Sequence, residues 1–251
     1  LGKLEERFVS FVLPDERVDK DVDSIALPLN QQALLPGLSQ FSQASLEAVV
    51  DSQESNNLKQ VLLAMWNFES AYGVLPPRMS VAEDGTPLLS WRVHLLPFLN
   101  EQALYDQFHL DEPWDSPHNI KLVEKIPSPY QSLDHSDLQL GYTCVQQPLT
   151  EGSLWNGDER KLLGVRDIRD GTSNTLGFVI APKQQAVPWT KPEELTVDPT
   201  RPIESLFGDR EQMLFALMDG SVQTLDRSET TPQRIMAALT HQGSEALTLR
   251  E

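Results

Sequence analysis

The sequence predicts an α+β fold in which a helix near the N-terminus packs on an antiparallel β-sheet. In the first half of the chain, apolar residues recur at spacings of three and four, the period of a helix with one buried face. In the second half, short runs of branched and aromatic residues lie between turn residues, which is typical of strands. Because helices come first and strands follow, the order favours α+β over an alternating α/β fold.

Residues 1–41 are predicted to be an extended lead-in arm that ends an upstream region, and residues 42–251 to be the α+β domain. The arm mixes charged residues with three prolines and has no sustained period. One strand is expected within it, near residues 8–13.

A helical pattern begins at Ser42 and is predicted to continue as one long helix to Tyr72, with a break within residues 51–55 as the alternative. Leu46, Val49 and Val50 lie on one side of its first part. The later part carries an apolar stripe, which we expect to pack on the sheet: Leu58, Val61, Leu62, Met65, Phe68 and Tyr72. Gly73 suits the left-handed residue that follows a helix end.

Short helices are predicted between this helix and the sheet. Ser90 can cap a helix that includes Val93, Leu96 and Leu99 and is kinked by Pro97. Leu104, Tyr105 and Phe108 continue as a second piece. Asp115 or Ser116 can cap a third helix whose first position is Pro117.

The strands are predicted within residues 138–147, 161–171, 172–182, 212–220 and 221–228. Asp219-Gly220 lies between the last two runs, and this dipeptide is a strong signal for a tight hairpin. Thr231-Pro232 begins a closing helix with Ile235, Met236 and Leu239 inward. The proline-rich residues 187–202 are predicted to be a surface loop.

Charge and cysteine content exclude several classes of function. The 37 acidic and 20 basic side chains give a formal charge of −17, which argues against nucleic acid or an anionic membrane as a partner. No segment has the apolar length of a membrane span, so no membrane segment is expected in this chain. With Cys144 as the single cysteine, an internal disulfide or a thiolate zinc site is excluded, and we expect this thiol in the core.

Catalytic motifs with recognisable spacing are missing from the sequence, so we expect a protein that is not an enzyme. The five histidines are scattered: His94, His109, His118, His135 and His241. The DGTSNT segment (170–175) is predicted to be a turn bonded by its own side chains. A hydrolase built from Asp170, Ser173 and a histidine is the remote alternative.

One acidic cluster has the composition of a calcium site. Asp111, Glu112, Asp115 and Asn119 surround Trp114 and offer several oxygen ligands of the kind that calcium prefers. The alternative is a helix N-terminus with acidic residues, which the helix dipole favours by itself.

Seven motifs occur along residues 56–251 in an order that resembles one family. They are NNLKQ, AYGVLPP, LSWRVHLLPFLNEQALYDQF, EPWDSPHN, IRDGTSNT, AVPWTKPEEL and MDGSV. This is the planctomycete domain of unknown function 1559 family, whose members are labelled prepilin-type proteins. The resemblance implies a pilin-like fold similar to type II secretion pseudopilins, an extracytoplasmic location, and calcium at the EPWDSP region. Those relatives open with an apolar anchor helix, whereas the matching region here is polar, so any anchor or signal is expected upstream.

Three classes of function remain open. The first is a non-enzymatic, pseudopilin-like extracytoplasmic module that acts in assembly, display or interaction with a protein partner. The second is a solute- or glycan-binding module that uses exposed tryptophans, for which the candidates are Trp91, Trp114, Trp155 and Trp189. The third is the hydrolase. The oligomeric state is left open.

Overall fold

The computed structural model describes residues 31–132, 138–157 and 162–243, with side chains from residue 48 onward in these ranges. The chain divides into two compact units, residues 1–44 and 45–251. In the first unit, the described residues form the start of helix α2 (Gln31–Tyr72). The strand predicted near residues 8–13 lies outside the described residues.

The extended arm predicted up to residue 41 is wrong from Gln31 onward, because these residues are helical. Pro36 and Gly37 are unfavourable inside a helix, and this is why the sequence predicts an arm. Local propensity is a weak prior, however, and α2 continues through both residues. The predicted single long helix, without a break in residues 51–55, is confirmed.

The apolar stripe of α2 is buried as predicted, except at its C-terminal end. The buried members are Leu58, Val61, Leu62 and Met65. Tyr72 was expected inward but is 64% exposed, and its ring contacts the rings of Phe68 and Phe98 at the margin of the core. Val49, on the apolar side predicted for the first part of the helix, is 65% exposed.

The main sheet has four strands in the order β10-β9-β6-β4, all antiparallel. The strands are β4 (Val145–Gln146), β6 (Leu176–Ile180), β9 (Gln212–Leu217) and β10 (Val222–Asp226). The hairpin predicted at Asp219-Gly220 joins β9 and β10 and is confirmed. Gly220 has a φ of 96°, which favours glycine, and the Ser221 amide donates to Asp219 Oδ1 at 2.9 Å.

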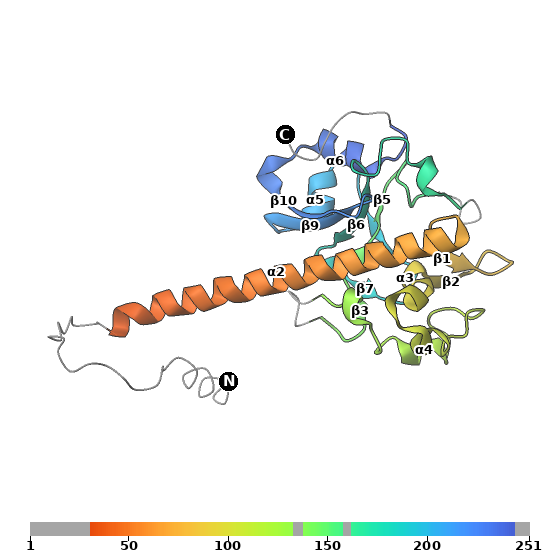
Figure 1. The fold of residues 1–251 in the computed structure, drawn as a ribbon, viewed down its shortest axis with the longest axis horizontal. Coiled ribbons are helices and arrows are strands. Elements are labelled where there is room, and N and C mark those ends of the chain that lie inside the picture. The colour runs from red at the N-terminus through yellow and green to blue at the C-terminus, as the bar shows by residue number, and fades with distance from the viewer. Residues whose placement is uncertain (1–30, 133–137, 158–161, 244–251) are drawn as a thin grey trace. The chain divides into compact units, whose positions relative to one another are not determined.

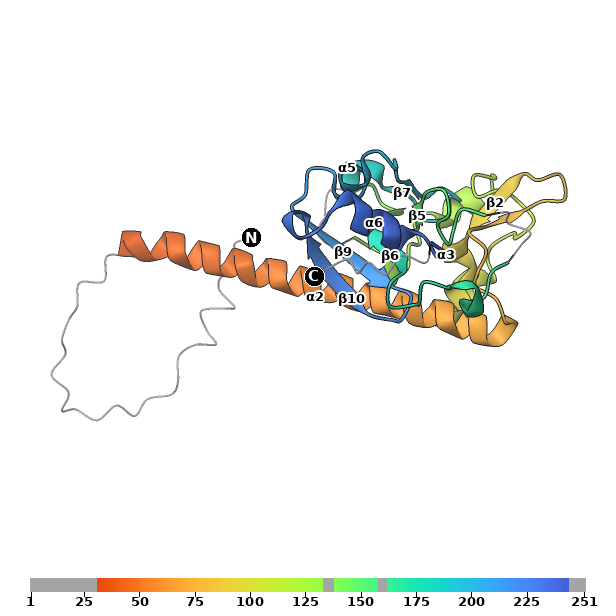
Figure 2. The same cartoon turned by 90° about the horizontal axis from the view of Figure 1, so that it is seen from above.

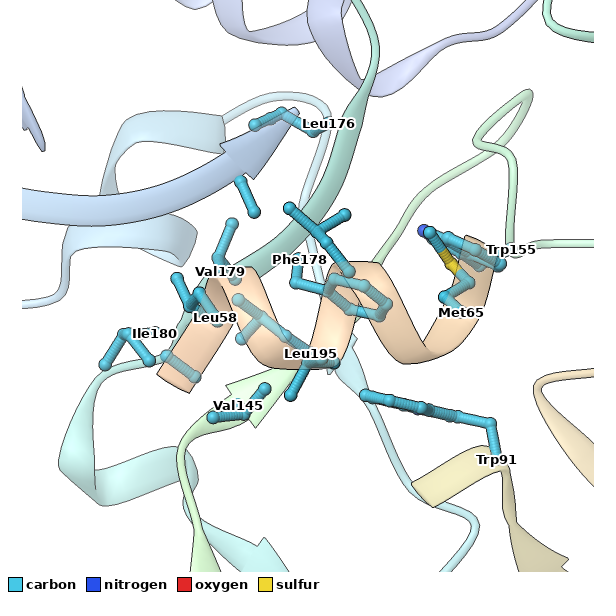
Figure 3. Close-up of a cluster of buried hydrophobic side chains, with 14 of the residues drawn as sticks. Leu58, Met65, Trp91, Val145, Trp155, Leu176, Phe178, Val179, Ile180 and Leu195 are labelled. Atoms are coloured by element: carbon cyan, nitrogen blue, oxygen red, sulfur yellow. The ribbon is translucent and has the colours of Figure 1, made fainter. Parts of the chain in front are cut away.

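The core lies between α2 and this sheet. Figure 3 shows Leu58 and Met65 of α2 beside Phe178 and Val179 of β6. A Cβ on Gly177 would lie 3.0 Å from Met218 Sδ, so the missing side chain leaves room for Met218 in the core. In Figures 1 and 2, α5 (Pro202–Phe207) and α6 (Pro232–Leu239) lie on the other side of the sheet from α2. Cover on both faces explains why β6 is buried along its whole length.

Replacing Leu62 with alanine should therefore lower the free energy of unfolding by about 3 kcal/mol, because it leaves a cavity under a helix that covers the sheet. Urea denaturation would measure the change. Leu63→Ala is the matched control, since Leu63 is 62% exposed on the same helix. Equal losses in the two variants would contradict this packing.

The closing helix α6 follows the sequence prediction closely. The Thr231 hydroxyl accepts from the Arg234 amide and caps the helix. Ile235 and Leu239 are buried, and Met236 is partly buried against the core.

The segment between α2 and the sheet begins with a hairpin that the sequence analysis missed, β1 (Met79–Val81) and β2 (Pro87–Ser90). Ser90 then caps α3 (Trp91–His94), as predicted, because its hydroxyl accepts from the Arg92 amide. Instead of one kinked helix, α3 is followed by a separate 3₁₀ helix, Leu96–Leu99, with Pro97 in its first turn. The second predicted piece is α4 (Gln102–Tyr105), and the third is only a 3₁₀ helix, Asn119–Leu122.

Two predictions for the second half are wrong. The run 161–171 contains a 3₁₀ helix, Val165–Asp167, and no strand among its described residues. The predicted surface loop 187–202 contains buried Trp189 and Leu195. It also holds two short strands, β7 (Val187–Pro188) and β8 (Leu195–Thr196), which pair with β3 (Tyr142–Thr143) and β5 (Pro148–Leu149). Prolines at strand edges made this segment resemble a loop. The remaining 3₁₀ helices are Ser128–Tyr130, Lys183–Gln185 and Arg227–Glu229.

Cys144 is fully buried in the core, as predicted. Among the described residues, none of the helices has both the length and the apolar character needed to cross a bilayer.

His94 makes the stability of the fold depend on pH. Burial lowers the pKa of His94 to about 4, and its Nε2 atom has no hydrogen-bond partner among the described residues. An unfolded histidine titrates near 6.5, so the unfolded chain binds more protons between these two values. Stability is therefore present above pH 6.5 and should fall by as much as about 3 kcal/mol as the pH drops toward 4.

Denaturant titrations of the native protein and of His94→Phe across this pH range would measure the effect. Carboxylate titrations occur in both proteins and cancel in the difference. The native protein should lose more stability on acidification than the variant, and parallel pH profiles would contradict the role of His94.

Candidate functional site

The acidic loop predicted to bind calcium is organised by the buried side chain of Asn119. Its amide oxygen accepts from the His109 amide at 3.0 Å. Its amide nitrogen donates to the carbonyl oxygens of His109, Glu112 and Pro113 at 2.9–3.2 Å. The Ser116 hydroxyl accepts from the Asn119 amide, which closes the turn. Asn119 therefore holds the loop together, and its oxygen already has a backbone partner.

The three carboxylates of this loop lie at the surface. Asp111 and Asp115 are exposed, and Glu112 is half-exposed. Hydrogen bonds from the Ser116 hydroxyl and from His109 hold the pKa of Glu112 below its usual range. Among the described residues, no group of three or more His, Cys, Asp or Glu side chains is placed to hold a metal ion. Calcium binding by this loop stays a prediction, and it would rely on these carboxylates.

Calorimetric titration with calcium tests this prediction. If Asp111, Glu112 and Asp115 bind the ion, millimolar calcium should release heat and raise the melting temperature, because an ion that binds only the folded state stabilises it. The double variant Asp111→Asn/Asp115→Asn should lose both effects. Glu83→Gln, which removes a carboxylate from another exposed loop, is the control. An unchanged melting temperature in the native protein would contradict the site.

Two histidine side chains, nine residues apart in the sequence, are in contact on this loop. The rings of His109 and His118 stack with centroids 3.5 Å apart and planes 5° apart. His109 Nδ1 lies 2.8 Å from Glu112 Oε1, and His118 Nε2 lies 2.7 Å from the Gln107 carbonyl oxygen. The sequence analysis treated all five histidines as scattered. A spacing of nine residues gives no signal, because only the turn made by Asn119 brings the two rings together.

Trp114, which belongs to this loop, also lines a cleft of about 550 Å³. The Trp114 amide donates to the Leu88 carbonyl at 2.9 Å, which ties the loop to β2. The lining includes Trp114, Tyr142, Gln146, Lys191, Glu193 and Thr196. Lys191 Nζ lies 5.8 Å from the centre of the Trp114 ring and also pairs with Glu193. The cleft thus combines aromatic surface, amides and charges of both signs.

The other candidate tryptophans belong to the core. Trp91 and Trp189 are fully buried, and Trp155 is 5% exposed. Their indole N–H groups donate to Glu194 Oε1, the Val123 carbonyl and the Gly177 carbonyl, respectively. The predicted aromatic binding surface is therefore reduced to Trp114, because the other three rings face protein.

A buried ion pair supports the inner wall of the cleft. Arg92 and Glu194 have no exposed side-chain surface, and their charged groups approach to 2.8 Å. The Arg92 guanidinium also donates to the Val145 carbonyl through two nitrogens and to the Ser90 hydroxyl. The sequence analysis missed this pair, because Arg92 lies in an apolar segment 102 positions away from Glu194.

The carboxylate of this pair has further partners. Glu194 accepts from the Trp91 indole at 2.9 Å and from the Gln147 amide at 2.7 Å. Burial raises the pKa of Glu194, and the nearby Arg92 opposes that shift. Because Glu194 also lines the cleft, the network fixes the position of the segment that carries Lys191 and Glu193.

The DGTSNT segment (170–175), on which the hydrolase alternative depends, forms the predicted turn. The Asp170 carbonyl oxygen accepts from the side-chain amide of Asn174, and the Asp170 carboxylate accepts from the backbone amide of Gly243. The Thr175 hydroxyl donates to the Gly171 carbonyl. These bonds confirm the structural interpretation of DGTSNT.

Comparison with known proteins gives one match. The family model described as "Protein of unknown function (DUF1559)" matches residues 52–148, which confirms the predicted resemblance to that family over this range. No curated protein and no solved structure shows a significant match to the chain.

Proposed function

We propose that this chain is a non-enzymatic, pseudopilin-like, extracytoplasmic module, and that the Trp114 cleft binds a segment of a partner protein. The composition of the cleft is the main support for this proposal. A half-buried tryptophan beside charged and amide side chains is the composition of a protein-recognition surface, where aromatic residues supply most of the binding energy. The extracytoplasmic location rests on the family resemblance.

Two further observations support a binding role. The Asp170 carboxylate, which a hydrolase would recruit from DGTSNT, accepts a structural hydrogen bond from the Gly243 amide. The formal charge of −17 disfavours polyanionic partners, so a protein partner with basic residues is the better electrostatic match.

A solute- or glycan-binding role is the second candidate, and the size of the cleft favours it. About 550 Å³ is within the range of small-molecule sites, and Trp114 and Tyr142 could each stack on a sugar ring. Three of the four tryptophans first considered for this role lie in the core, so the role would depend on Trp114 and Tyr142.

Site-specific photo-crosslinking in the native cells distinguishes the candidates. A photoreactive side chain at Thr196, which is exposed in the cleft, should yield a discrete protein adduct. The same group at Leu63, which is exposed on α2 outside the cleft lining, should not. Trp114→Ala should abolish the Thr196 adduct because it removes the main aromatic contact.

Other outcomes would count against a protein partner. Binding of the purified chain to an oligosaccharide array, lost in Trp114→Ala, would favour the second candidate instead. Turnover of ester, glycoside or peptide substrates that disappears in Asp170→Asn or Ser173→Ala would overturn the non-enzymatic proposal.

A further inference from the structure

We propose that His109 and His118 together bind one divalent transition-metal ion of the copper, nickel or zinc class. Their stacked rings, with centroids 3.5 Å apart, place every nitrogen of one ring within a few ångströms of the other ring. Imidazole nitrogen is the ligand that these ions prefer, whereas calcium and magnesium prefer oxygen. This ion and these ligands differ from those of the predicted calcium site, and the proposal does not rest on the proposed function.

The hydrogen bonds of the two rings determine which nitrogens are available. A carbonyl oxygen only accepts, so His118 carries its proton on Nε2, which donates to Gln107. A carboxylate likewise accepts, so His109 donates from Nδ1 to Glu112. In the neutral imidazoles, His109 Nε2 and His118 Nδ1 then keep their lone pairs, and neither has a hydrogen-bond partner in the part of the chain that the structure describes.

This pattern is the usual arrangement around metal-binding histidines. Such residues almost always donate their second nitrogen to a carboxylate or a backbone carbonyl, which fixes the tautomer and the direction of the ring. Such acceptors are present for the stacked rings, Glu112 for His109 and the Gln107 carbonyl for His118; they fix the tautomers, whereas the ring planes change on binding. Glu112 Oε1 lies 2.8 Å from His109 Nδ1, so this carboxylate can orient the His109 ring without binding the ion itself.

The loop holds the two histidines near each other while leaving them accessible. Asn119 is buried and bonds to both the amide and the carbonyl of His109, and it follows His118 directly in the chain. The His109 side chain is 49% exposed and that of Glu112 is 39% exposed, so an ion can reach the rings from solvent.

Binding requires a change in the ring planes. With the planes only 5° apart, the two lone pairs cannot point at one ion, so each ring must turn about its Cβ–Cγ bond. This torsion is broad for histidine, and exposed side chains turn within nanoseconds. Two protein nitrogens leave the remaining coordination positions to water, which agrees with the lack of a third His, Cys, Asp or Glu ligand among the described residues.

Calorimetry and electron paramagnetic resonance of the whole chain would test the proposal. One copper(II) ion should bind per chain, more tightly than nickel(II) or zinc(II), and the spectrum should show coupling to two imidazole nitrogens. Calcium and magnesium should not compete with copper. Glu112→Gln should weaken copper binding by about 10–100-fold, because it removes the carboxylate that orients His109.

Phenylalanine variants keep an aromatic ring in the stack while removing its nitrogens. His109→Phe and His118→Phe should each reduce copper affinity more than Glu112→Gln does. His241→Phe should leave it unchanged, since this exposed histidine bonds the Gly152 carbonyl elsewhere on the chain. Unchanged affinity in His109→Phe or His118→Phe, or loss of binding in His241→Phe, would overturn the proposal. The spectrum of the native protein does not depend on how the variants fold, and coupling to fewer than two nitrogens would also overturn it.

Discussion

Replacing Arg92 with methionine is expected to lower the free energy of unfolding by about 3–5 kcal/mol. The change leaves the Glu194 carboxylate buried without its counter-ion, and an uncompensated buried charge is among the most destabilising defects in a protein. It also removes the hydrogen bonds that Arg92 donates to the Val145 carbonyl and the Ser90 hydroxyl. Urea denaturation at neutral pH would measure the loss.

A double variant separates the charge from the hydrogen bonds. Arg92→Met/Glu194→Gln carries no buried charge and keeps an oxygen that can accept from the Trp91 indole. It should recover part of the stability lost in Arg92→Met, because removing both charges costs less than removing one. A double variant less stable than Arg92→Met would mean that Glu194 is accommodated without a counter-ion.

Gly141→Ala should also be strongly destabilising, by about 4 kcal/mol. Gly141 has a φ of 86°, where an L-residue costs about 1–2 kcal/mol. A Cβ at this position would lie only 2.5 Å from the Val123 carbonyl oxygen, so the backbone itself must move. Such a shift would strain the Trp189 region, because the Trp189 amide donates to Gly141 and its indole donates to Val123.

Gly85→Ala is the matched control for this substitution. Gly85 has nearly the same φ, 89°, but no atom lies within 4 Å of its would-be Cβ. Its cost should be limited to about 1–2 kcal/mol for the backbone conformation. Thermal or urea denaturation of both variants would give the difference, and equal losses would show that the contact with Val123 has no effect.

Features that depend on neighbouring residues were predicted well from the sequence. The stripe of α2 from Leu58 to Met65, the caps at Ser90 and Thr231, and the Asp219-Gly220 hairpin all follow from period or turn chemistry within a few residues. Each of these features depends on contacts between residues a few positions apart, or on the burial of one apolar helix face.

Features that depend on distant residues were not predicted. Residues 187–202 resemble a loop because their burial comes from partners such as Tyr142 and Leu149 far away in the chain. The ion pair joins residues 102 positions apart, and neither residue carries a local signal of burial. In the candidate site, the cluster of residues 111–119 was identified by composition, but the inward role of Asn119 and the contact of the two imidazoles arise from the path of the backbone.

The ion pair also bears on where the folding unit ends. The match to the family model ends at residue 148, yet Arg92 pairs with Glu194, and the partners of β3, β4 and β5 all lie beyond residue 175. A fragment that ended at residue 148 would lack the strands that pair with β3, β4 and β5, and it would lack the counter-ion of Arg92. The matched segment therefore depends on later residues for its strand pairing, and we expect the cooperative unit to include β6, β7 and β8 as well.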